Sequence, residues 1–109
     1  MTARFPMAIA TYLDAVDRGD VEASLTAFTD DATVVDEGHT HTGEAIRRWR
    51  SSAGSEFTYT NEFRGLHTVD EDHFVADFHL EGNFPGGVVD LRYRFALRDG
   101  RIEHLEIAP

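Results

Sequence analysis

The chain has 109 residues, of which 41% are hydrophobic and 11% aromatic, and this is enough for one folded domain spanning residues 1–109. Twenty acidic residues against ten basic ones give a net charge of −10, which disfavours a nucleic-acid partner because its phosphates would be repelled. All ten basic residues are arginine and there is no cysteine, so lysine Schiff bases, thiolate nucleophiles and cysteine-ligated metal sites are excluded.

The sequence also bears on membranes and location. No run of residues is long and apolar enough to span a membrane. A helical pattern follows Arg4, where a signal peptide would have its apolar core. We therefore expect a cytoplasmic protein with no membrane partner. Its small core favours a dimer.

The first half of the chain is expected to be mainly helical. Apolar residues recur every three or four positions from Phe5 to Val16 and predict a first helix. Gly19 suits the end of that helix, and Asp20 suits the N-cap of a second one, whose apolar spacing continues to Phe28. A short β-branched strand is predicted at 32–35, before a third helix that begins near residues 42–43. The predicted inner face of this third helix is Ala45, Ile46 and Trp49, and the predicted outer face is Arg47, Arg48 and Arg50.

The second half of the chain changes to a period of two, which is typical of strands. Strands are predicted at 57–64, 74–81, 88–97 and 101–107, separated by turns at 70–72, 85–87 and 99–100. Each strand has one apolar and one polar face, as in an antiparallel sheet that helices cover on one side. Ile102 is out of phase with Leu105 and Ile107, which indicates a β-bulge in the last strand.

The polar faces of two neighbouring predicted strands carry opposite charges. Asp77 and His79 share one polar face, and Asp90, Arg92 and Arg94 share the next. We interpret these residues as cross-strand ion pairs on a surface that faces solvent or a second subunit.

Several segments, in chain order, resemble a known family. Residues 12–23 (YLDAVDRGDVEA) are similar to the first two helices of SnoaL-like proteins, in the nuclear transport factor 2-like superfamily. Residues 28–36 (FTDDATVVD) resemble the helix-to-strand corner of the same family, and the helix around Trp49 and the hairpin at Asp99-Gly100 also fit. The resemblance implies an α+β fold, a cone-shaped barrel in which three N-terminal helices pack on a strongly curved antiparallel sheet around a deep pocket. It also implies a homodimer formed through the sheet.

The resemblance does not select one activity. The superfamily includes isomerases, cyclases, dehydratases and non-catalytic binding domains, so function has to be argued from the site. We expect a central pocket for a small hydrophobic ligand, with no cofactor. The alternative is a cofactor-free acid/base enzyme acting on a hydrophobic carbonyl compound. The predicted pocket wall consists of Trp49, Phe57, Tyr59, Phe78, Leu91, Tyr93 and Leu105, which are equally suited to a plain core.

Tyr12 and Asp36 are the first two candidate catalytic residues. They match the positions at which ketosteroid isomerase has a tyrosine on its first helix and a carboxylate after its first strand. A carboxylate in an apolar pocket can take a proton next to a carbonyl, and a tyrosine hydroxyl can hydrogen-bond the resulting enolate. The isomerase also uses a protonated aspartate on a later strand, where this sequence has Leu91. Alternatively, Tyr12 is a core residue and Asp36 a turn or capping carboxylate.

Histidines supply the third candidate. His39 and His41 alternate on a predicted edge strand and could share one side, with His79 as a conceivable third metal ligand. A competent metal site needs three or four converging ligands, and no further spacing supports one, so no metal is expected. Exposed strand histidines are the favoured interpretation, with His41 as a candidate proton carrier at the pocket mouth.

Overall fold

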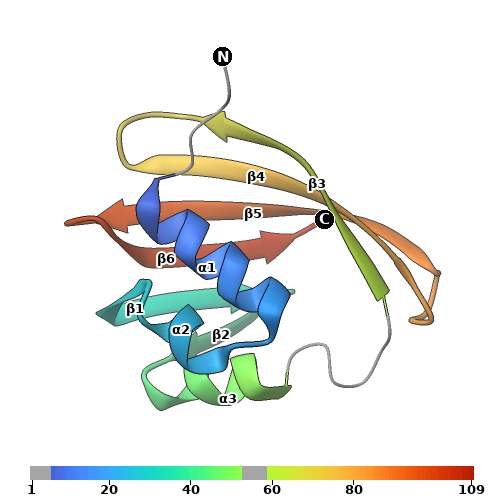
Figure 1. The fold of residues 1–109 in the computed structure, drawn as a ribbon, viewed down its shortest axis with the longest axis horizontal. Coiled ribbons are helices and arrows are strands. Elements are labelled where there is room, and N and C mark those ends of the chain that lie inside the picture. Colours follow the sequence, from blue (N-terminus) through green and yellow to red (C-terminus); the bar gives the residue numbers. More distant parts are fainter. Residues whose placement is uncertain (1–5, 53–58) are drawn as a thin grey trace.

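The computed structural model describes residues 6–52 and 59–109 (Figure 1). Three helices lie on one side of a curved, open sheet of six strands, whose order is β2-β1-β6-β5-β4-β3. The expected α+β architecture, with helices packed on a curved sheet, is therefore confirmed. The elements are α1 (Met7–Arg18), α2 (Val21–Leu25), β1 (Phe28–Asp36), β2 (His39–Thr42), α3 (Glu44–Ser52), β3 (Tyr59–Thr68), β4 (His73–Gly82), β5 (Val88–Arg98) and β6 (Arg101–Ala108).

The junction between α1 and α2 forms as its residues predict. Gly19 ends α1 with φ 71°, a left-handed conformation that glycine adopts without steric cost. The side chain of Asp20 accepts a hydrogen bond of 3.0 Å from the backbone N–H of Ala23, which is the expected N-cap contact. However, α2 stops at Leu25, and Phe28 begins β1 instead of extending the helix. Phe28 pairs with Ile102, so pairing with β6 overrides the helical spacing.

The sheet is mixed, which corrects the prediction of a wholly antiparallel one. The β2–β1, β6–β5, β5–β4 and β4–β3 pairs are antiparallel, but β1 and β6 run parallel. The predicted bulge is confirmed: Ala96 pairs with His104 and Leu97 with Ile102, which leaves Glu103 as the extra residue. A bulge of this kind increases the local twist and thereby helps the sheet to curve around the helices.

The core lies between α1 and the centre of the sheet. Tyr12 and Phe95 are its two largest fully buried side chains, at 1% exposure each. Their ring centroids are 6.1 Å apart in an edge-to-face arrangement, and the Tyr12 ring meets Phe28 in the same way at 5.4 Å. Leu105 on β6 is completely buried in this cluster. The helices are therefore held on the sheet mainly by aromatic and aliphatic packing.

The outer face of the sheet carries the predicted cross-strand ion pairs. His79 on β4 contacts Asp90 on β5 at 2.6 Å, and Arg92 contacts Asp77 at 3.5 Å. His79 also contacts Glu81, and hydrogen bonds to these two carboxylates raise the pKa of the imidazole. Within the described residues, no helix has the length and apolar character that a bilayer crossing requires.

Candidate functional site

A hollow of about 590 Å³ lies where α1 and α3 approach the sheet. Its aromatic wall consists of Trp49, Tyr59, Phe84 and Tyr93. A second hollow, of about 580 Å³, lies between α1 and strands β3–β5. The two share four lining residues, so they adjoin under α1: Val16, Tyr59, Asn61 and Tyr93.

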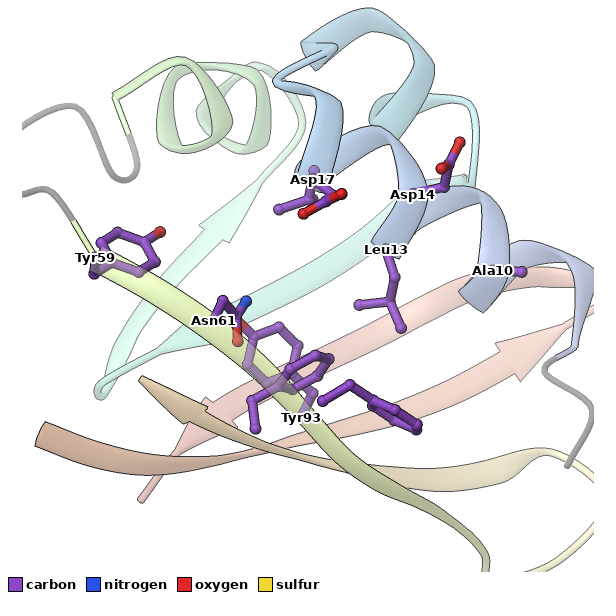
Figure 2. Close-up of a pocket in the computed structure, with 10 residues that line it drawn as sticks. Ala10, Leu13, Asp14, Asp17, Tyr59, Asn61 and Tyr93 are labelled. Carbon is purple, nitrogen blue, oxygen red and sulfur yellow. The ribbon is translucent and has the colours of Figure 1, made fainter. Parts of the chain in front are cut away.

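Figure 2 shows how side chains from opposite layers face each other across the second hollow. Tyr59 and Asn61 come from β3 and Tyr93 from β5, while Leu13 and Asp17 come from α1. The floor of this hollow is therefore apolar and aromatic, and its rim on α1 carries carboxylates. Apolar concave surfaces with a few polar groups are the usual form of small-molecule sites.

Asp36 lines the first hollow and is only partly buried. It is the last residue of β1, where pairing with His39 on β2 and Ile107 on β6 fixes its backbone. Its Oδ2 accepts a hydrogen bond of 2.9 Å from the indole N–H of Trp49. This bond satisfies the buried indole donor and orients the carboxylate.

Tyr12 is a core residue whose hydroxyl accepts a hydrogen bond from Arg50. Its ring belongs to the core and does not line either hollow, but its hydroxyl lies within the electrostatic reach of Arg50 and Asp36. Burial raises the pKa of Tyr12 to about 12, although the nearby Arg50 guanidinium acts in the opposite direction. The hydroxyl is therefore a neutral donor at physiological pH. Burial likewise raises the pKa of Tyr93.

Arg50 is the site residue that the sequence interpretation missed. It was assigned to the outer face of the third helix, but it lines the first hollow and is half-buried. Its Cζ lies 5.0 Å from the centroid of the Trp49 ring, in a cation–π contact. The available signal was helical spacing, since Ile46, Trp49 and Arg50 are related as i, i+3 and i+4 and therefore share one face.

We define the Trp49 corner as Asp36, Trp49 and Arg50. The Trp49 indole contacts the carboxylate through its N–H and the guanidinium through its ring face. The corner thus places a negative and a positive group in one part of an otherwise largely apolar hollow. Such an arrangement can orient a ligand that carries both an acceptor and a donor.

The candidate histidines lie elsewhere. The His41 ring stacks on Trp49 with centroids 5.9 Å apart but does not line either hollow, and His39 is exposed. His79 is engaged on the outer face of the sheet and does not approach them. Among residues 6–52 and 59–109, no three potential metal ligands come together.

The other predicted wall residues are distributed between the hollows and the core. Leu91 lines the first hollow and Phe78 the second. Leu105 lies in the core instead of the lining of either hollow, because β6 occupies the middle of the sheet beneath α1. Phe57 lies outside the described residues.

The buried Tyr12 hydroxyl predicts a loss of stability at high pH. Its pKa is about 12 in the folded protein, against an ordinary value of 10.0 for tyrosine, so burial of the neutral form stabilises the fold fully below pH 10. That contribution is lost as pH rises from about 10 to about 12, by roughly 2 kcal/mol for this one group. Urea unfolding at about pH 9 and about pH 11.5 should show a smaller decrease for Tyr12→Phe than for the wild type. Equal decreases in the free energy of unfolding for the two proteins would contradict a raised pKa of the Tyr12 hydroxyl.

The comparisons with known proteins agree with this geometry. The SnoaL-like domain family matches residues 9–105. A candidate polyketide cyclase from Sinorhizobium meliloti is 39% identical, with 95% of each chain covered and a TM-score of 0.87. No curated protein sequence matches this chain.

More distant structures share the fold. A Mycobacterium tuberculosis protein in complex with estradiol-17β-hemisuccinate is 17% identical, with a TM-score of 0.77 over 94% of this chain and 91% of that one. TerC, co-crystallised with polyporic acid, is 18% identical, with a TM-score of 0.79 over 93% and 87%. With the family match over nearly the whole length, the chain belongs to the SnoaL-like domain family.

Proposed function

We propose that this SnoaL-like domain binds a small hydrophobic ring compound in the first hollow. The observation that carries the proposal is a space of about 590 Å³ whose wall is largely aromatic and whose charged groups include Asp36 and Arg50 at the Trp49 corner. Aromatic walls favour flat apolar ligands through burial and ring packing. A few polar groups then fix the orientation of the ligand.

The relatives support a ligand-binding role at the level of the fold. The Mycobacterium tuberculosis protein holds a steroid derivative and TerC was crystallised with polyporic acid, both of which are ring compounds. We also propose a homodimer formed through the outer face of the sheet and a cytoplasmic location, both of which remain predictions.

A fluorescent probe tests ligand binding directly. N-phenyl-1-naphthylamine is neutral and apolar and brightens on entering an apolar site, so we expect saturable binding to the wild type. Leu91→Trp should weaken this binding by about fivefold or more, because overpacking a cavity wall costs about 1 kcal/mol or more. Leu91 lines the hollow and is only 9% exposed.

Val88→Trp on the same strand is the matched control. Val88 is 57% exposed, so it should accept the same indole without affecting binding of the probe. Thermal unfolding should show that both variants are folded. A wild type that does not bind the probe, or equal affinity in Leu91→Trp and the wild type, would contradict a ligand site in this hollow.

The second candidate function is cofactor-free proton transfer. The observation that favours it is that Asp36 lines the hollow while the neutral Tyr12 hydroxyl lies within its electrostatic reach. In this proposal Asp36 removes a proton next to a ligand carbonyl, and the Tyr12 hydroxyl stabilises the enolate oxygen. Leu91 occupies the position of the second oxyanion donor of ketosteroid isomerase and cannot donate a hydrogen bond.

A further inference from the structure

Arg50 brings a guanidinium with several donor groups to the first hollow, and it hydrogen-bonds the Tyr12 hydroxyl. Its guanidinium contacts the face of the Trp49 ring, with Cζ 5.0 Å from the ring centroid. A cation–π contact of this kind does not consume the N–H donors, of which arginine has five in a planar fork. Because Arg50 also lines the hollow, the donors that the Tyr12 hydroxyl does not use can reach a ligand.

The neighbouring carboxylates do not neutralise Arg50 by direct pairing. In the described part of the chain, Arg18, Arg47 and Arg98 each form ion pairs with carboxylates, but Arg50 forms none. Two carboxylates line this hollow: Glu37 and Asp36, whose Oδ2 accepts a hydrogen bond from the Trp49 indole N–H. Among the described residues, the guanidinium that lines the hollow is therefore not ion-paired with a carboxylate.

The positive charge of Arg50 also acts on other groups near the hollow. It acts on the Tyr12 and Tyr93 hydroxyls, which are on different elements facing the hollow. The interaction between two charges strengthens as they approach each other and as the surrounding dielectric constant falls. The overall net charge of −10 repels anions, but salt screens that repulsion beyond a Debye length of about 8 Å. At short range Arg50 therefore competes with Asp36 and Glu37, which line the same hollow, and not with the whole acidic surface.

We propose that the hollow selects flat aromatic compounds carrying an ionised acidic oxygen, which the Arg50 guanidinium pairs with. The rings of the ligand pack against Trp49, Tyr59 and Tyr93, and the anionic oxygen lies at the Trp49 corner. A carboxylate, a sulfonate and an acidic enolate share the required chemistry, since each presents a delocalised oxyanion to the planar guanidinium. This inference rests on the proposed function, because it specifies the ligand class of the same site.

Two probes that differ by one anionic group test the inference. 8-Anilinonaphthalene-1-sulfonate has the ring framework of N-phenyl-1-naphthylamine plus a sulfonate. We expect the wild type to bind the sulfonate about tenfold more tightly than the neutral probe. Arg50→Gln should weaken binding of the sulfonate far more than binding of the neutral probe, so that the preference is lost. Arg101→Gln, exposed at the start of β6, removes the same charge outside the hollow and should retain the preference.

Asp36→Asn should change the affinity for the sulfonate in the direction opposite to Arg50→Gln. Removing the negative charge from the Trp49 corner should tighten binding of the sulfonate more than binding of the neutral probe. Salt provides a test that needs no variant: raising the NaCl concentration from about 50 to about 500 mM should weaken only the sulfonate. This test decides the matter if Arg50→Gln does not fold.

The possible results distinguish a failure of anion selection by Arg50 from a failure of the proposed ligand site. If neither probe binds, the proposed ligand site itself is contradicted. If both probes bind, the ligand site is supported. If the neutral probe then binds as tightly as the sulfonate or more tightly, and neither Arg50→Gln nor salt changes the ratio of the two affinities, selection of anions is overturned. A wild-type preference for the sulfonate that survives in Arg50→Gln would also overturn the role of Arg50.

Discussion

Replacing Phe95 with alanine should lower the free energy of unfolding by about 3–5 kcal/mol. Phe95 lies on β5, at the centre of the sheet, and is only 1% exposed. Its ring contacts those of Tyr12 and Tyr93, with centroids 6.1 and 6.3 Å away. Removing it leaves a cavity beneath α1 that neighbouring rings cannot fill without leaving their own packing. Urea unfolding at neutral pH measures the loss.

Phe63→Ala on β3 removes the same ring from a different environment. Phe63 is 43% exposed, although its ring centroid is 5.6 Å from that of Phe78. Because part of that ring already faces water, its removal should cost less than half of the loss for Phe95→Ala. Similar losses at the two positions would show that the core is not centred on Tyr12 and Phe95.

Replacing Asp36 with asparagine should largely abolish any proton transfer by this domain. A general base contributes about 10²–10⁴-fold to a rate, and asparagine cannot accept the proton. Exchange of the α-protons of 2-tetralone for deuterium, followed by NMR, measures this step on a flat hydrophobic ketone without requiring knowledge of the natural substrate. The wild type should exceed buffer alone, and Asp36→Asn should lose the excess.

Two variants make the exchange experiment specific. Asp30→Asn changes an exposed carboxylate on the same strand and should exchange like the wild type. Tyr12→Phe should lower the exchange rate less than Asp36→Asn does, because it removes one oxyanion donor and keeps the base. A wild-type rate equal to that of buffer would eliminate the enzyme candidate and leave ligand binding as the function.

Local patterns in the sequence predicted the elements well but not all of their pairings. Period-two alternation and the Asp99-Gly100 turn indicated the β5–β6 hairpin, and the phase of Ile102 indicated its bulge. The parallel pairing of β1 with β6 could not be predicted in this way, since its partners are separated by most of the chain. For the same reason Phe28 was assigned to a helix: its partner Ile102 is invisible to local spacing.

Some residues near the candidate site could be predicted from helical spacing or from the family resemblance. The family resemblance pointed to Asp36, which lines the hollow, and to Tyr12, whose hydroxyl lies close to the Trp49 corner. Arg50 was missed because charge was taken as a sign of exposure, whereas a long arginine side chain can cover an aromatic ring and keep its head group in a hollow. Leu105 lies in the core, because alternation identifies an inward face but does not distinguish a packed core from a cavity wall.

The parallel contact between β1 and β6 has a consequence for how the chain reaches its native state. Strands β3 to β6 follow one another as neighbours, so they can associate through short loops. β1 can join them only when a loop of roughly 70 residues closes, which carries a large entropic cost and raises the contact order. Docking of the β1–β2 hairpin onto a preassembled four-stranded meander is therefore the expected slow event, and the hollow acquires Asp36 only when that event is complete.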